Sequence, residues 1–281
     1  MATATPAEFQ RQQAATAQGT LLLVRRQWDR MASLDDWPTI AARVTLLTAA
    51  GQAAAARRAA EWTMATLAGL RAPEPVATVN PAAFVGIASD GRPLDSLLYS
   101  STVTARNLYA DPVLQMESGR RQVSMLARTM VADAGRGAAQ VTITATPLAG
   151  YVRMVSPPCC KDCAVLAGKW FKHNEGFERH PNCDCTHVPR VGANIPDGYV
   201  SDIPTDQITN LSDGERKALD GGADLSRVVN ASRKGRGMST TVGTGRRPRG
   251  ARLTPDGIYR IASNRDEALT LLGRYGYLRT S

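Results

Sequence analysis

All five cysteines of this 281-residue chain lie between Cys159 and Cys185, and no cysteine occurs elsewhere. Cysteines that form disulfides are usually spread over a fold, whereas local clustering in a protein made in the cytoplasm favours a metal site. A loop-rich segment of this size is too small to hold itself together by a hydrophobic core. The cysteine segment, residues 151–190, is therefore expected to fold around a metal.

The spacing of Cys160 and Cys163 is that of the first half of a zinc knuckle, in which two thiolates on a tight turn share one tetrahedral ion. His180-x2-Cys183 and Cys183-x-Cys185 both have the reach to supply the second half. The candidate ligands are Cys160, Cys163, His180, Cys183 and Cys185, of which a zinc ion needs four. Four protein ligands leave no open position for a water, so the predicted zinc is structural.

Two other interpretations of the cysteines stay open at this point. One is a disulfide or free-thiol arrangement, although Cys183-x-Cys185 and the adjacent pair Cys159-Cys160 are awkward for ordinary bridges. The other is a set of packed thiols without any ligand. Cys159 is the cysteine least expected to bind metal.

Apolar residues at helical spacing predict helices over residues 6–31 and from Pro38 to about Leu70. Together they form a helical hairpin, assigned to residues 1–72. Aromatic residues make up only 5% of the chain, and alanine is abundant in the first half, which favours helices over a sandwich or barrel.

Residues 73–190 are expected to form a second region that begins with a proline-rich connector over 73–93. A helix follows over residues 94–110, and another starts at Pro112 with Asp111 as its cap and ends near Gly135 and Gly137.

Residues 140–146 alternate valine and isoleucine with threonine and predict a strand. A second strand over 151–155 would complete a β-hairpin. The predicted fold class is therefore α+β and predominantly α-helical, with a small β-hairpin beside the cysteine segment.

Residues 191–281 read as an extended basic arm with a short helix around 213–219 and a terminal helical element that opens at Thr254. The apolar positions of the terminal element are Ile258, Ile261, Leu269 and Leu272. No acidic residue occurs between Leu225 and Pro255. The candidate nucleic-acid or partner-binding residues in this stretch are Arg227, Arg233, Lys234, Arg236, Arg246, Arg247, Arg249 and Arg252.

The formal net charge of +9 points to polyanionic partners. The basic arm suits the phosphates of packaged double-stranded DNA, or an acidic protein surface, equally well. No apolar run reaches the length of a membrane span, and no secretory signal is apparent. The expectation is a protein made in the cytoplasm, with no membrane partner.

Three stretches carry a resemblance to a known family: Arg153-Met-Val-Ser-Pro-Pro-x-Cys, Cys163-Ala-Val-Leu-Ala-Gly, and Gly176-Phe-Glu-Arg-His-Pro-Asn-Cys-Asp-Cys. They resemble the phage Mu F-like minor head protein family, in the form found in phages of actinobacteria. The match covers about 40 residues closely and the neighbouring regions loosely. It implies a structural protein of the virion that associates with the portal protein during head assembly, with the major capsid protein and packaged DNA as further partners.

An enzyme, chiefly a capsid maturation protease, is the main alternative, and a non-specific DNA-binding protein is another. The three histidines, His173, His180 and His187, all lie in or beside the cysteine segment, and no serine lies in a Gly-x-Ser-x-Gly turn. A Cys-His protease needs a reactive cysteine apart from a metal cluster. The sequence therefore predicts a non-enzymatic protein.

Overall fold

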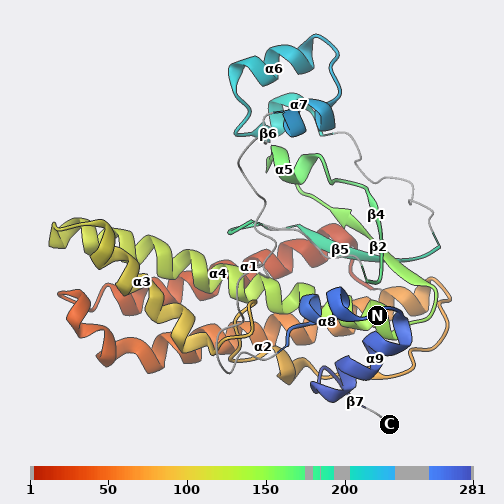
Figure 1. The fold of residues 1–281 in the computed structure, drawn as a ribbon, viewed down its shortest axis with the longest axis horizontal. Helices are drawn as coiled ribbons and strands as arrows, with labels where there is room; N and C mark the ends of the chain where they lie inside the picture. Colours follow the sequence, from red (N-terminus) through yellow and green to blue (C-terminus); the bar gives the residue numbers. More distant parts are fainter. Residues whose placement is uncertain (1–2, 175–179, 184, 193–202, 232–252, 280–281) are drawn as a thin grey trace.

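Four long helices, α1 (Pro6–Trp28), α2 (Trp37–Gly69), α3 (Leu94–Leu108) and α4 (Pro112–Ala145), lie lengthwise against one another and form the body of the protein in this computed structural model (Figure 1). The structure describes residues 3–174, 180–183, 185–192, 203–231 and 253–279. The predicted hairpin is present as α1 and α2, which are linked by the 3-10 turn η1 (Leu34–Asp36). The predicted cap is also present, because Asp111 accepts a hydrogen bond from the backbone of Val113 (2.7 Å).

Close contact between α1 and α4 depends on one residue without a side chain. Trp28 is almost fully buried, and its indole N–H donates to the carbonyl of Met116 (3.2 Å). Its ring lies directly on Gly119, where a Cβ atom would come within 2.5 Å of two ring carbons. The two helices therefore approach one another only because residue 119 is glycine.

The strand predicted over residues 140–146 is wrong, and so is the helix end near Gly135 and Gly137, because α4 continues to Ala145. Every residue from Gln140 to Ala145 is buried, so the alternation of threonine with apolar residues does not mark two faces of a strand. The threonine hydroxyls are accommodated within the helix, since Thr142 donates to the carbonyl of Ala138 (2.8 Å).

The central strand β2 (Ala149–Met154) confirms the strand predicted over 151–155, but its partners differ from the expected hairpin. It pairs antiparallel with β4 (Trp170–Lys172) on one side and with β5 (Thr186–Val191) on the other. Tyr151 lies opposite Pro189 on β5, where proline is tolerated because β5 is an edge strand. The sheet covers one side of the helical body (Figure 1).

Residues 159–164 form the short strand β3 (Cys159–Cys160) and the single turn α5 (Lys161–Ala164). A further layer lies on them. It consists of η3 (Thr205–Gln207), β6 (Ile208–Thr209), α6 (Asp213–Asp220) and α7 (Leu225–Ala231). Strand β6 pairs in parallel with β3, and α6 confirms the predicted short helix. Helix α7 corrects the expectation that the arm is extended from residue 225.

The end of the chain returns to the helical body. Helices α8 (Pro255–Ile261) and α9 (Arg265–Arg274) replace the single terminal element, because Asn264 caps a second helix. Ile258 and Leu272 are buried, but Ile261 is 58% exposed and was wrongly expected to be a core position.

The final strand β7 (Leu278–Arg279) pairs with β1 (Thr78–Val79), which precedes the turn η2 (Pro81–Phe84). One cluster of buried residues contains Phe9, Ala138, Val188 and Tyr277, so all three regions named from the sequence contribute to it. The structure confirms a predominantly helical α+β fold. No helix in the described part of the chain is both long and apolar enough to cross a membrane.

Candidate metal centre

The five predicted ligands are brought together above the central strand of the sheet. Cys160 ends β3 and Cys163 lies one turn later in α5, while Cys183 and Cys185 immediately precede β5. Their side-chain ligand atoms form two groups, Cys160–Cys163–His180 and Cys163–Cys183–Cys185, and within each group all ligand atoms lie within 4.8 Å of one another. Cys163 belongs to both groups, so a metal ion bound by either group would have the Cys163 sulfur as one of its ligands.

Individual distances show how tight the cluster is. The Nε2 atom of His180 lies 2.9 Å from the sulfur of Cys160 and 3.3 Å from that of Cys163. The sulfurs of Cys163 and Cys183 are 3.6 Å apart, and none of the five cysteines forms a disulfide. The backbone N–H of Cys163 donates to the sulfur of Cys160 at 3.4 Å, which favours a thiolate there.

The hydrogen bonds of His180 orient its imidazole as a metal ligand would be oriented. Its Nδ1 atom lies 2.8 Å from the carbonyl oxygen of Pro181, which requires the proton to be on Nδ1 and leaves Nε2 facing the thiols. The hydrogen bond with Cys160 raises the pKa of His180 to about 9, against the opposing effect of burial. The pKa of the Cys160 thiol is lowered to about 5, first by its hydrogen bond with Cys163 and then by His180.

A buried arginine lies beneath the sulfurs. Arg153 lies next to the end of β2, is 2% exposed, and directs Nη2 to the sulfurs of Cys163 (3.7 Å) and Cys183 (3.8 Å). Burial by itself lowers the pKa of Arg153, but electrostatic attraction to the sulfurs of Cys185, Cys183 and Cys163 outweighs it and raises the pKa above its usual value. The guanidinium therefore stays charged and favours anionic sulfur around it.

A second buried arginine fixes the loop that carries Cys183 and Cys185 to the helical body. Arg136 on α4 donates to the carbonyl oxygens of Cys183 and, through Nε at 2.8 Å, of Cys185. Its Nη1 atom also donates to Asp133, one turn earlier, at 2.7 Å. Asp133 and Arg136 are both less than a tenth exposed, so this ion pair is buried between α4 and the loop that carries Cys183 and Cys185.

Sequence reasoning missed Arg136, Asp133 and the role of Arg153. The available signal for the first two was a charged pair at i, i+3 within a helix stretch otherwise made of alanine, glycine and valine. Arg153 was part of the stretch that resembles a family, but its place among the sulfurs comes only from the strand pairing of β2.

The outer side of the cluster is closed by the layer that contains α6. Cys159 is buried and belongs to neither ligand group, as its expected non-ligand role requires. Its carbonyl oxygen accepts a hydrogen bond from the hydroxyl of Thr209 (3.1 Å). Next to it, Lys161 forms a largely buried ion pair with Glu215 on α6 (2.7 Å). The cluster of candidate ligands thus lies between the sheet, α4 and the α6 layer.

The predicted basic residues fall mostly outside the described residues. Arg227 is exposed on α7. The remaining seven are not among the described residues: Arg233, Lys234, Arg236, Arg246, Arg247, Arg249 and Arg252. Contact between this stretch and DNA stays a prediction.

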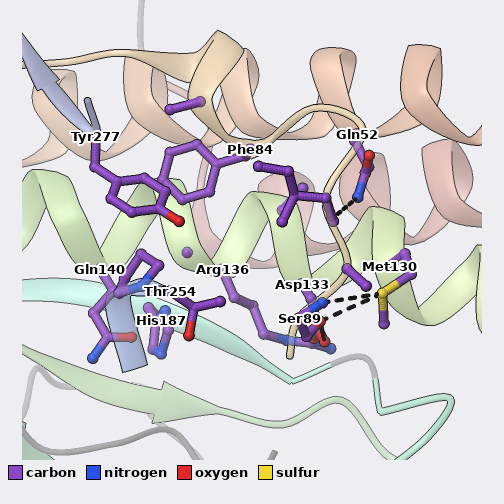
Figure 2. A pocket seen from close by; sticks show the side chains of 16 residues that line it. Gln52, Phe84, Ser89, Met130, Asp133, Arg136, Gln140, His187, Thr254 and Tyr277 are labelled. Carbon is purple, nitrogen blue, oxygen red and sulfur yellow. Dashed lines mark hydrogen bonds and ion pairs between the residues drawn. The ribbon is translucent and has the colours of Figure 1, made fainter. Parts of the chain in front are cut away.

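A small pocket of about 50 Å³ lies on the other side of Arg136, between α4, β5 and the C-terminal segment. Figure 2 shows Ser89, Asp133 and Arg136 together at one end and His187 and Thr254 further along. Ser89 donates to Asp133 at 2.5 Å, and Arg136 donates to the other carboxylate oxygen. His187 packs edge-on against Tyr151, with ring centroids 4.3 Å apart. The carboxylate of Asp133 therefore accepts hydrogen bonds from Ser89 and Arg136, which is the arrangement of a structural ion pair.

The chain matches no protein-family model, and neither the curated proteins nor the solved structures provide a match.

Proposed function

We propose that this chain is a structural, non-enzymatic minor head protein of a tailed bacteriophage, held together by one zinc ion bound to Cys160, Cys163, His180 and Cys183. The observation that carries the zinc is the pair of three-ligand groups, Cys160–Cys163–His180 and Cys163–Cys183–Cys185, that share Cys163. The part of the proposal that concerns the virion is supported by the sequence resemblance described above.

The distances in the cluster support tetrahedral zinc. Zinc–sulfur bonds of about 2.3 Å and zinc–nitrogen bonds of about 2.0 Å place two ligand sulfurs about 3.8 Å apart and a sulfur and a nitrogen about 3.5 Å apart. The observed separations are 3.6 Å for Cys163 and Cys183, 3.3 Å for Cys163 and His180, and 2.9 Å for Cys160 and His180, the last of which would have to lengthen on binding zinc.

The charges support three thiolates and one neutral histidine. Three thiolates and a Zn²⁺ ion carry a net charge of about −1, and the buried guanidinium of Arg153 neutralises it. A fourth thiolate in place of His180 would leave a buried negative charge uncompensated. Cys185 is then a buried thiol next to the site, with its carbonyl held by Arg136.

Zinc in this position would join two segments that are separate along the chain. The ligands come from the turn after β3 and from the loop before β5, and these segments also contact α6 and α4. A small module with a metal at its centre gains folding free energy on binding, because the ligands are not preformed in the unfolded chain. Four protein ligands would fill the tetrahedral coordination of the zinc and leave no position for an activated water. This supports a structural role for the metal.

Metal analysis of the full chain, purified without chelator under reducing conditions, tests the site. We expect about one zinc per chain, lost in Cys163→Ser and Cys183→Ser and retained in the control Cys159→Ser. Cys185→Ser is expected to retain zinc as well. Loss of zinc in Cys185→Ser together with retention in Cys183→Ser would contradict the ligand set, and wild-type protein without metal would contradict the zinc.

The virion role is tested separately, on particles. We expect the protein in purified virions and in complexes isolated with the portal protein of the same phage. Incubation of the purified chain with the major capsid protein is expected to leave that protein intact. Specific cleavage would replace the structural assignment with the protease alternative, without affecting the zinc result.

A further inference from the structure

Three arginines follow the seam between α1 and α4, two helices that lie side by side in the helical body (Figure 1). Arg25 on α1 reaches across this seam, because its Nε atom donates to the hydroxyl of Ser124 on α4 at 3.1 Å. Arg121 and Arg128 lie three residues before and four residues after Ser124, so helical spacing puts them on the same side of α4. The three guanidinium groups therefore line one seam, which we call the α1–α4 seam.

A small pocket shows independently that Arg128 lies beside α1. The pocket has a volume of about 30 Å³, and its lining includes Ala14 and Ala17 of α1 together with Arg128 of α4. Arg25 and Arg128 are both half-buried, which limits the freedom of their side chains. Arg25 is bonded to α4 one helical turn before Arg128, about 6 Å along the helix axis, so both guanidinium groups can approach a single phosphate.

The middle of the α1–α4 seam carries positive charge that no carboxylate balances. Neither Arg25 nor Arg128 forms an ion pair with any residue that the structure describes. The sequence contains no acidic residue over 9–28 in α1 or over 118–132 in α4. Two cations without a counter-charge therefore lie about one helical turn apart.

Arg121 can add a third positive charge at one end of the seam. Its ion pair with Glu117 is long, at 3.5 Å, and the two side chains are 64% and 60% exposed. An exposed pair of this kind stabilises a protein very little, because water screens it and both side chains lose freedom. The guanidinium of Arg121 can therefore leave Glu117 and turn to an external anion.

We propose that the α1–α4 seam binds the phosphate backbone of double-stranded DNA through Arg25, Arg121 and Arg128. A guanidinium pairs with a phosphate through two parallel hydrogen bonds. Seven residues separate Arg121 from Arg128, about 10 Å along α4, and one DNA strand presents about three phosphates over that length of its axis. The match is to the backbone alone, so the binding would not read base sequence.

The charge of the whole chain favours the same ligand over an acidic protein. The net charge is +9, and the stretch between Leu225 and Pro255 has no acidic residue. The α1–α4 seam lies on the helical body and not on that stretch, so it would be a second, separate contact with DNA. The proposal depends neither on the zinc site nor on the virion assignment.

Salt dependence of DNA binding by the full chain tests the proposal. Fluorescence anisotropy with a labelled duplex of about 20 base pairs gives the association constant at several salt concentrations. The logarithm of this constant falls with the logarithm of salt concentration by about 0.9 for each phosphate that is neutralised. Arg25→Gln combined with Arg128→Gln should lower the slope by about 1.8 and weaken binding at about 0.1 M salt by at least tenfold.

Two control proteins separate the seam from general charge and from packing. Arg43→Gln combined with Arg57→Gln removes the same charge from exposed positions on α2 and should keep the wild-type slope. Arg25→Lys combined with Arg128→Lys keeps both positive charges and should also keep most of the slope. Circular dichroism and zinc content check that each variant keeps its fold. Every protein compared contains the stretch after Leu225, so its contribution cancels.

Four results would overturn the proposal. They are no duplex binding by the wild type at low salt, an unchanged slope in the glutamine variant of the seam, an equal decrease in the α2 control, and a loss of slope in the lysine variant. A glutamate-rich peptide that binds more tightly than the duplex, and only with Arg25 and Arg128 present, would instead assign the seam to an acidic protein.

Discussion

Replacing Arg153 by methionine keeps most of the length of the side chain but removes the one positive charge that contacts the sulfurs of Cys163 and Cys183. At 3.7 Å and an effective dielectric constant of about 20, a unit charge pair is worth roughly 4 kcal/mol. Loss of one partner from a buried pair costs about 3–5 kcal/mol, because the remaining charge has no compensation. We therefore expect Arg153→Met to lower the free energy of unfolding of the zinc-bound protein by about 3–5 kcal/mol.

The size of the loss should depend on zinc. With zinc bound, the thiolates cannot take up protons and the net negative charge stays in the interior. Without zinc, thiols can be protonated instead, so the same substitution should cost less. Urea unfolding with and without a chelator, under reducing conditions, measures both values. For a chain of this size the melting temperature of the zinc-bound variant should fall on the order of 10 °C.

Arg190 provides the matched control. It lies on the neighbouring strand β5, is half-buried, and donates to the carbonyl of Pro189 at 2.9 Å. Arg190→Met is expected to cost less than about 1 kcal/mol, with no dependence on chelator. An equal loss for Arg153→Met in the two metal states, or a loss below about 1 kcal/mol with zinc bound, would refute the charge balance proposed for the site.

Three further results are expected. Gly119→Ala should destabilise the protein by about 1–3 kcal/mol, because the new Cβ meets the indole ring packed against it, whereas Gly19→Ala on the exposed side of α1 should stabilise it slightly, both by urea unfolding. In metal-free reduced protein, NMR should show the imidazole of His180 titrating near pH 9. The positive charge of His180 therefore stabilises the fold fully below the ordinary histidine pKa, and this stabilisation is lost as the pH rises through about 9. Bound zinc should abolish the titration. Glu215→Gln leaves the buried ammonium of Lys161 without its partner and should cost about 3 kcal/mol, and no loss would show that this ion pair does not hold the α6 layer.

The positions of the helices could be predicted where the chain carries local signals. Aspartate and proline at residues 111 and 112 mark the start of α4, and the apolar spacing in residues 6–31 marks α1. The clustering of the cysteines likewise predicted which side chains would meet, because their spacing constrains them to one short loop system.

Other features depended on contacts between distant residues. Residues 140–146 look like a strand because threonine alternates with apolar residues, but α4 continues through them since all its sides are covered there. The end of the chain pairs β7 with β1, and local patterns do not specify that pairing.

The sequence by itself determined a helical protein with one cysteine and histidine cluster, because caps, helical periodicity and short ligand spacing act over a few residues. Tertiary structure decided which charged side chains surround that cluster and which ones fix its loop in place. Arg153 reaches the sulfurs through the strand pairing of β2, and Arg136 reaches the ligand loop from the last third of α4. Burial of these two arginines depends on the packing of the sheet against the helices, and that packing is a property of the whole fold.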